Sequence, residues 1–278
     1  MDTKVTLAGH RGWRAKYPEN TMRGFREVLK IDIDAIEMDV HMTKDYRIVV
    51  CHDGNLARTT DKKGNIWELT LDEVREADAG IKFGEEFKGE KVPMLEEFLE
   101  LMATRPDIKV LLELKDYPES LGDFAYASAE LTLSLFREYG IFGKDRLTVI
   151  TFSAGLVAWL RTRYTKEDFS IHGFYPKAKM HGWEKDDPYK YYDEVCIFNS
   201  SDKDSTGMPI KHDSPVADKA RFIEFKLMGI KPCVHYGMNT DFEVYKKSIE
   251  NGAIGFTCDH PDICGEYLDR LGARKLKK

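Results

Sequence analysis

The sequence lacks any apolar run approaching the roughly 20 residues that a membrane-spanning helix needs, and we therefore expect no stable membrane anchor. It also lacks a block of basic residues: 48 acidic side chains outnumber 42 lysines and arginines, which gives a net charge of −6. This balance argues against nucleic acid as a partner, because nucleic acids are bound through clustered lysine and arginine. Interspersed charges and a 42% share of hydrophobic residues exclude a disordered chain.

Cysteine is scarce and shows no metal-binding or redox spacing. The five cysteines are Cys51, Cys196, Cys233, Cys258 and Cys264. None forms a Cys-x-x-Cys pair, and an odd number cannot all pair within one chain. The N-terminal residues lead into an apolar stretch without a signal-peptide pattern. We therefore expect a reducing, cytoplasmic location, and the sequence leaves the oligomeric state open.

Short β-branched apolar runs alternate with amphipathic runs along the whole chain. Strands are expected at residues 5–9, 35–41, 47–52, 109–115, 147–153, 170–175, 194–199, 231–236 and 253–258. Helices are expected at residues 21–30, 94–104, 124–139, 156–164, 216–227, 241–251 and 263–271. Such alternation is typical of a parallel sheet with crossover helices, and eight or nine units in 278 residues favour a closed (β/α)8 barrel over an open sheet. Residues 1–278 are therefore expected to form one barrel domain.

Two stretches break this rhythm. Between Asp39 and His52 there is too little chain for a crossover helix, so one connection should be irregular. Residues 53–92 are polar, and their one short helix is signalled by a capping box of Thr70 and Glu73. We expect residues 53–92 to form a small subdomain inserted after the third strand. It should lie at the same end of the barrel as His52, because it leaves directly from that strand end.

Polar side chains collect where the expected strands end. Seven of them belong to four strands: His10, Arg11, Glu37, Asp39, His52, Glu113 and Lys115. Glu37 and Asp39 are two residues apart, and so are Glu113 and Lys115, which places each pair on one face of its strand. Any one of these residues is more often structural than functional. Because charged groups are costly to bury without a partner or a cation, the seven together indicate a single site.

The residue types of this site suggest its chemistry. The three carboxylates, Glu37, Asp39 and Glu113, suit a hard divalent cation, Mg²⁺ or Ca²⁺, held at about 2.0–2.6 Å. Arginine and lysine beside such an ion suit a phosphate group. The two imidazoles suit a general acid and a general base working near neutral pH. The site therefore predicts metal-assisted phosphoryl transfer on a small-molecule phosphodiester.

The motifs around these residues resemble those of the glycerophosphodiester phosphodiesterases. Six occur in order: Ala8-Gly9-His10-Arg11-Gly12, Pro18-Glu19-Asn20-Thr21, Ile36-Glu37-Met38-Asp39-Val40, Thr43-Lys44-Asp45, Val49-Val50-Cys51-His52-Asp53 and Leu112-Glu113-Leu114-Lys115. Weaker matches are Thr151-Phe152-Ser153 and Gly255-Phe256-Thr257-Cys258-Asp259-His260-Pro261-Asp262. The resemblance covers nearly the whole chain and is densest over residues 8–115.

The resemblance implies a (β/α)8 barrel with a small inserted subdomain and the hydrolysis of a glycerophosphodiester to glycerol 3-phosphate and an alcohol. It implies these roles: metal binding by Glu37, Asp39 and Glu113, acid–base catalysis by His10 and His52, and phosphate contact by Arg11 and Lys115. Asn20 is expected to brace the first loop, to cap the following helix, or both.

The C-terminal part departs from the family pattern. Residues 236–239, Tyr-Gly-Met-Asn, stand where the family often has a Trp-Thr-Val-Asn-like strand end, and Cys258 precedes Asp259 where a threonine is usual. These changes leave the identity of the alcohol open. Phe152, Tyr175 and Tyr236 are candidate walls of its pocket, although core packing is the commoner role of an aromatic residue.

Two alternatives remain open. The first is a lysophospholipase D-like or other phosphodiesterase activity on the same barrel, which an exposed apolar rim or a lipid-sized pocket would favour. The second is a non-catalytic phosphodiester-binding protein. The pair His10 and His52 argues against the second, because a binding protein has no need of a proton shuttle.

Overall fold

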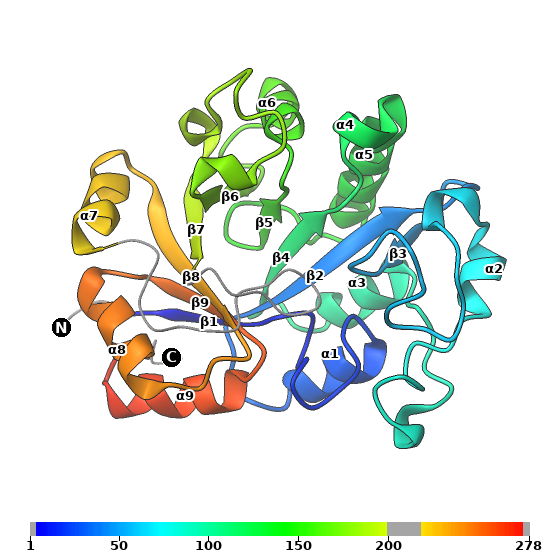
Figure 1. Cartoon of the computed structure of the whole chain (residues 1–278), viewed down its shortest axis with the longest axis horizontal. Helices are drawn as coiled ribbons and strands as arrows, with labels where there is room; N and C mark the ends of the chain where they lie inside the picture. Colours follow the sequence, from blue (N-terminus) through cyan, green and yellow to red (C-terminus); the bar gives the residue numbers. More distant parts are fainter. Residues whose placement is uncertain (1–3, 199–217, 275–278) are drawn as a thin grey trace.

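The computed structural model describes residues 4–198 and 218–274, and the sheet at its centre closes into a barrel. Within these residues eight strands pair in parallel in the order β1-β9-β8-β7-β6-β5-β4-β2, and β2 pairs again with β1 (Figure 1). The barrel strands are β1 Thr6–Gly9, β2 Ala35–Met42, β4 Lys109–Leu114, β5 Leu147–Ile150, β6 Ser170–Tyr175, β7 Glu194–Phe198, β8 Lys231–Gly237 and β9 Gly255–Cys258. The predicted (β/α)8 barrel is therefore confirmed.

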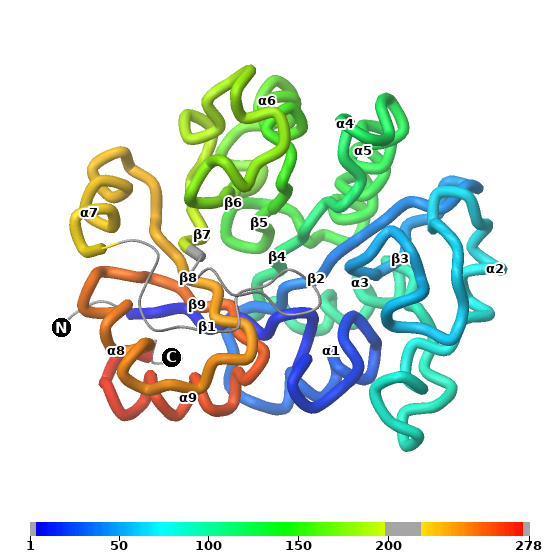
Figure 2. The backbone as a smooth tube through the Cα atoms, in the orientation of Figure 1, coloured from blue at the N-terminus to red at the C-terminus, as the bar shows by residue number. Residues whose placement is uncertain are grey.

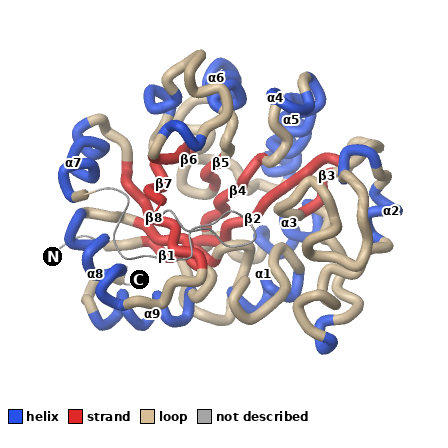
Figure 3. Tube along the Cα trace, viewed as in Figure 1, coloured by secondary structure: helices blue, strands red, loops and turns tan. Residues whose placement is uncertain are grey.

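Helices surround the barrel on the outside (Figure 3). They are α1 Met22–Val28, α3 Leu95–Ala103, α4 Pro118–Leu121, α5 Asp123–Glu138, α6 Ala154–Arg163, α7 Lys219–Leu227, α8 Phe242–Asn251 and α9 Pro261–Arg270. The connection from β6 to β7 carries only two short 3₁₀ turns, Lys177–Lys179 and Pro188–Tyr191. The expected elements at 194–199 and 216–227 extend to residues 199, 216 and 217, which lie outside the described residues. No helix of the described part has both the length and the apolar character to cross a bilayer.

The irregular connection expected between Asp39 and His52 is a returning strand. Strand β3, Ile48–Val50, runs antiparallel to the far end of β2, with Val40 opposite Val50 and Met42 opposite Ile48. The strand expected at 47–52 is thus shorter and is not a barrel strand. Because β3 runs back toward the barrel, it carries the chain past Asp39, whose carbonyl accepts from the amide of Cys51 at 3.0 Å.

The segment after β3 has a hydrophobic cluster of its own. In Figure 2 it is the cyan region beside β2 and β3. It holds α2, Leu71–Arg75, and the 3₁₀ turns Ile66–Glu68 and Glu85–Phe87. The predicted capping box is confirmed, because Thr70 and Glu73 each accept from the other's backbone amide. The cluster consists of Val49, Cys51, Leu56, Ile66, Leu71, Val74, Ala77, Ala79 and Val92, and is separate from the main core.

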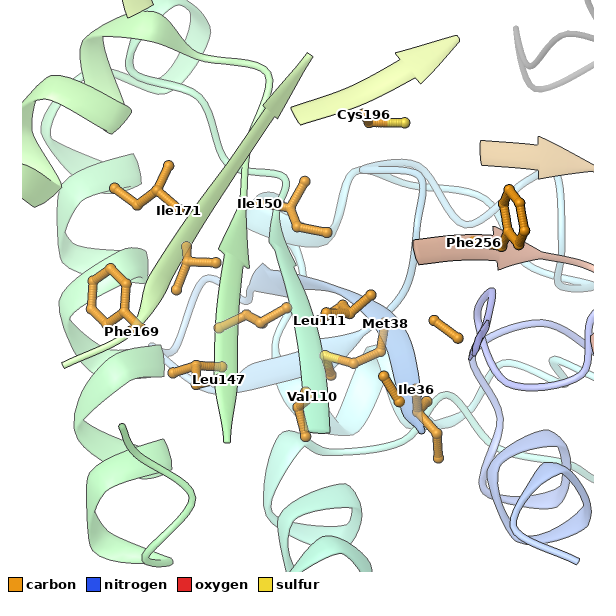
Figure 4. Close-up of a cluster of buried hydrophobic side chains, with 14 of the residues drawn as sticks. Ile36, Met38, Val110, Leu111, Leu147, Ile150, Phe169, Ile171, Cys196 and Phe256 are labelled. Atoms are coloured by element: carbon orange, nitrogen blue, oxygen red, sulfur yellow. The ribbon is translucent and has the colours of Figure 1, made fainter. Parts of the chain in front are cut away.

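Side chains of each barrel strand point alternately toward the surrounding helices and toward the barrel interior. On β2, Ile36 and Met38 are buried among the helices, whereas Glu37 and Asp39 alternate with them and face the barrel interior. The outward layer continues over neighbouring strands, as Figure 4 shows for Val110 and Leu147. Stability therefore comes largely from the outward face, and the inward face is left to carry polar groups at the carboxyl ends of the strands.

We predict that Gly173→Ala destabilises the protein strongly and that Gly155→Ala does not. A Cβ on Gly173 of β6 would lie 1.7 Å from the Cζ atom of the buried Tyr192 ring, whereas one on Gly155 of α6 would make only ordinary contacts. Overpacking of this kind costs about 1–3 kcal/mol or more, and a helical Gly→Ala gains up to about 1 kcal/mol. Urea unfolding of both variants measures the difference, and equal midpoints would contradict the packing at β6.

Candidate active site

A pocket with an empty volume of about 450 Å³, including its open mouth, lies at the carboxyl end of the barrel strands. Six of the seven predicted residues line it: His10, Arg11, Glu37, His52, Glu113 and Lys115. The seventh, Asp39, is fully buried beside it, with Oδ1 3.3 Å from the Nζ atom of Lys115. The fold thus brings all seven residues together, although 105 positions separate the first from the last.

Glu37, Asp39 and Glu113 form a buried acidic cluster in which one oxygen from each lies within 4.8 Å of the others. Burial and the neighbouring Asp39 raise the pKa of Glu37 well above its ordinary value. Burial also raises the pKa of Glu113, although Lys115 Nζ lies 2.6 Å from its Oε1. Burial acts in the same sense on Asp39, but Lys115 and His52 outweigh it and hold that pKa low.

The donor set of this cluster fits a divalent cation. It offers three carboxylate groups, the ligands that hard cations prefer. The nearby Lys115 and Arg11 do not neutralise it fully, because the carboxyls of Glu37 and Glu113 still have raised pKa values. A dication would favour the ionised form of these groups and so remove the cost of burying them.

His10 is held by a carboxylate from the last barrel strand. Its Nδ1 lies 2.5 Å from Oδ1 of Asp259, which follows β9, and Arg14 donates to Oδ2 of the same carboxylate at 2.9 Å. With Nδ1 engaged, Nε2 is the atom left for chemistry, and it lies 3.8 Å from Oε2 of Glu37. Burial and the charge of Arg11 lower the pKa of His10, so its imidazole is neutral near pH 7.

His52 is held in the same way from the other side of the site. Its Nδ1 lies 2.5 Å from Oδ1 of Asp53, and the Nε atom of Arg58 donates to Oδ2 of Asp53 at 2.6 Å. His41 lies 3.2 Å from the carbonyl oxygen of His52 through Nε2. Burial and the charge of Lys115 lower the pKa of His52 to about 3. The imidazoles of His10 and His52 are therefore both neutral near pH 7 and are oriented through Nδ1.

The first loop places Arg11 in a left-handed backbone conformation, φ 51°. The backbone amide of Arg11 donates to Oε2 of Glu37 at 2.9 Å, and its guanidinium donates to Oε1 of Glu19 at 2.8 Å. Asn20 holds this loop as predicted: its amide donates to the carbonyl of Arg11 at 3.0 Å, and its Nδ2 donates to Oδ2 of Asp39 at 2.8 Å. The expectation that Asn20 caps the next helix is wrong, because Thr21 accepts the capping bond of α1.

The comparisons with known proteins agree with this geometry. The model of the glycerophosphoryl diester phosphodiesterase family matches residues 10–263. The chain belongs to this family. A glycerophosphodiester phosphodiesterase of Caldanaerobacter subterraneus is 32% identical over 188 residues, which are 62% of this chain and 76% of that protein. A lysophospholipase D GDPD1 of Rattus norvegicus is 27% identical over 289 aligned residues, covering 95% of this chain and 86% of that protein.

Two solved structures share the fold. A glycerophosphodiester phosphodiesterase from Agrobacterium tumefaciens superposes with a TM-score of 0.69 at 23% identity, covering 94% of this chain and 99% of that one. A phosphodiesterase from Oleispira antarctica, in complex with the product sn-glycerol-3-phosphate, has a TM-score of 0.74 at 21% identity. That likeness covers 96% of this chain and 97% of the other.

Only one of the three aromatic residues that were expected to line the pocket does so. Phe152 lines the pocket as expected and stacks on Phe174 with ring centroids 3.7 Å apart. Tyr175 instead contacts Phe225 outside the barrel, and Tyr236 is fully buried in the outer core. Both of these expectations are wrong by one position. In β6 and in β8 the residue before the tyrosine faces the barrel interior, and the tyrosine therefore faces outward.

Two further histidines line the pocket and carry no sequence motif. His235 of β8 is the inward neighbour of Tyr236, and its ring centroid lies 4.4 Å from that of His10. His172 of β6 also lines the pocket, with Nδ1 3.4 Å from Oε2 of Glu194. Only the alternation of strand residues could have marked them, and that signal does not say which face is inward.

We predict that, in chelator, the free energy of unfolding of the wild type falls relative to that of Glu37→Gln as the pH rises from about 5 to 8. The folded protein keeps a proton on Glu37 that the unfolded chain releases above its ordinary pKa of 4.5. This retained proton lowers the free energy of unfolding by up to about 1.4 kcal/mol for each pH unit, until the pH exceeds the pKa of Glu37 in the folded protein. Urea titrations at each pH measure the difference, and a constant difference would contradict the raised pKa.

Proposed function

We propose that this protein hydrolyses glycerophosphodiesters to glycerol 3-phosphate and an alcohol. One observation carries the proposal: a single pocket gathers two aspartate-bound imidazoles, Arg11, Lys115 and three carboxylates. Family membership supports it, and so does the Oleispira antarctica relative, which holds sn-glycerol-3-phosphate. These residues match the needs of phosphodiester cleavage, which are charge stabilisation on phosphorus oxygens and proton transfer at the attacking and leaving oxygens.

In this proposal Glu37, Asp39 and Glu113 hold one divalent cation, Mg²⁺ or Ca²⁺. When bound, the cation supplies positive charge that polarises a phosphoryl oxygen. Arg11 and Lys115 bind the non-bridging oxygens of the phosphate. Their positions suit this role, because both already lie against the acidic cluster and line the pocket. Hydrogen bonds between charged partners are among the stronger ones available to a substrate.

The two imidazoles divide the proton transfers between them. The glycerol carries a hydroxyl next to its phosphorylated carbon, and one Nε2 atom takes the proton of that hydroxyl as its oxygen attacks phosphorus. The other imidazole acts as the acid in its doubly protonated form, which the negative charge of the bound phosphodiester favours, and donates the proton on its Nε2 to the departing alcohol. The roles reverse when water opens the cyclic phosphate. Asp259 and Asp53 each hold Nδ1 of one imidazole, so that Nε2 of His10 and of His52 is the atom that gains or loses the proton in each step.

A lysophospholipase D-like activity is the second candidate. The relative from Rattus norvegicus bears that name and aligns with 95% of this chain. One wall of the pocket is apolar, formed by Ile150, Phe152, Phe174 and Cys196. A pure binding protein is disfavoured, because carboxylates that fix the tautomers of two histidines serve proton transfer rather than affinity.

We further propose that residues 1–278 act as a single catalytic barrel domain with residues 53–92 as an insertion subdomain. The hydrophobic cluster of this segment, which is separate from the main core, supports this division. A cytoplasmic location remains part of the proposal, supported by five free cysteines.

A hydrolysis screen tests the substrate class and the cation together. We expect turnover of glycerophosphodiesters with Mg²⁺ or Ca²⁺, loss of turnover in excess EDTA, and recovery when the cation is restored. Glu113→Gln should weaken cation binding, measured as a smaller rise of Tm on adding the cation. Lysolipids in the same screen decide between the two candidates. Full activity in EDTA would contradict the metal proposal, and no turnover of any diester would contradict the function.

His10→Ala and His52→Ala should each lower kcat by at least about 10²-fold, the usual contribution of a positioned acid or base. Both variants should keep their cation-induced rise of Tm. A diester with a nitrophenol leaving group needs little protonation, so it should partly rescue the variant that lacks the acid and not the one that lacks the base. Near wild-type rates in both variants would rule out the acid–base assignment. Impairment of only one would replace it with a mechanism that uses a single proton carrier.

A further inference from the structure

A continuous chain of charged side chains joins the imidazoles of His10 and His52. On the His52 side, Asp53 receives the Nε–H of Arg58 on the carboxylate oxygen that does not face the histidine. Arg58 then donates from Nη2 and Nη1 to Oε1 and Oε2 of Glu19, at 2.6 and 3.1 Å. The guanidinium of Arg58 thus spans two carboxylates, one of which touches His52.

The same arrangement is repeated on the His10 side. Arg14 donates from Nε to Oε2 of Glu19 at 3.0 Å and from Nη1 to Oδ2 of Asp259 at 2.9 Å. Asp259 in turn holds Nδ1 of His10 at 2.5 Å. Glu19 is therefore the centre of a chain with an arginine, an aspartate and a histidine on each side. It also accepts from Arg11, which faces the acidic cluster.

The members of this chain come from separate parts of the fold. Glu19 and Arg14 belong to the loop after β1, Asp53 and Arg58 follow β3, and Asp259 follows β9. The chain is largely shielded from water, with side-chain exposures from 0% for Asp259 and 10% for Glu19 up to 24% for Arg58 and 29% for Asp53. Buried ion pairs contribute little net stability, so their burial is better explained by the geometry they impose.

We propose that Glu19 is a positioning residue that couples the orientation of His10 and His52 through Arg14 and Arg58. This coupling rests on the proposed function only in the use made of the two histidines. Its physical basis is that each guanidinium fork fixes one aspartate relative to Glu19, and each aspartate fixes the imidazole it touches. A displacement at one histidine is therefore transmitted to the other, and the two proton carriers keep their spacing across the substrate.

The kinetic test uses Arg14→Lys, Arg58→Lys and the double variant. Lysine keeps the charge but cannot bridge two carboxylates as the guanidinium does. We expect each single variant to lower kcat by about 10-fold or more. The fold-loss of kcat in the double variant should be smaller, by at least about threefold, than the product of the two single fold-losses. Glu19→Gln should lose at least as much as the double variant, because it also weakens the contact with Arg11. Glu97→Gln, which breaks a comparable contact with Arg75 away from the pocket, is the control for stability alone.

A second readout does not depend on turnover. Nδ1–H protons held by carboxylates give separate low-field proton resonances, and Asp53→Asn and Asp259→Asn assign them to His52 and His10. We expect Arg58→Lys to shift the resonance of His10 as well as that of His52, and Glu97→Gln to shift neither. A shift confined to His52, or single losses that multiply in the double variant, would overturn the coupling. If the wild type turns over no diester while the distant shift is present, the proposed function fails and the coupling stands.

Discussion

The burial of three carboxylates at the mouth of the barrel is the constraint on which the rest of the site depends. Burial and the neighbouring Asp39 raise the pKa values of Glu37 and Glu113, and all three carboxyl groups have little water to solvate them. Charges in such a place must be compensated by neighbours or by a cation. The positions of Lys115 and Arg11 follow from this need, and so does a first loop that accepts left-handed backbone at Arg11.

The barrel tolerates this concentration of charge because its two faces are independent. Residues such as Ile36 and Met38 pack outward against the helices, and they supply apolar burial regardless of what their neighbours do inside. The inward residues near the carboxyl ends are then available for chemistry. The same alternation places His172 and His235 in the pocket and sends Tyr236 into the outer core. Position within the strand decides which residues line the pocket.

Strand β3 solves a separate geometric problem. A barrel strand followed by a crossover helix would move the chain away from the site, whereas β3 returns along β2 and delivers His52 beside Asp39. The segment that follows contributes Arg58, whose contacts with Asp53 and Glu19 tie it to the first loop. Both histidines are therefore supported by carboxylates that other segments hold in place, and their orientation depends on the assembled fold rather than on local sequence.

The sequence by itself determined the barrel, the seven polar residues and the family. Strand–helix alternation and motif spacing are properties of the linear sequence, so they can be recognised before the fold is known. Glu19, Asp53 and Asp259 belong to recognisable motifs, but the sequence does not show which side chains they contact. Arg14 and Arg58 carried no signal at all, since a charged residue in a polar loop looks the same whether it is solvated or buried. The tertiary structure alone decided that β3 is antiparallel, that Phe152 faces inward while Tyr175 and Tyr236 do not, and which carboxylate holds which imidazole. These depend on contacts between segments as far apart as His10 and Asp259, and no local pattern encodes such distances.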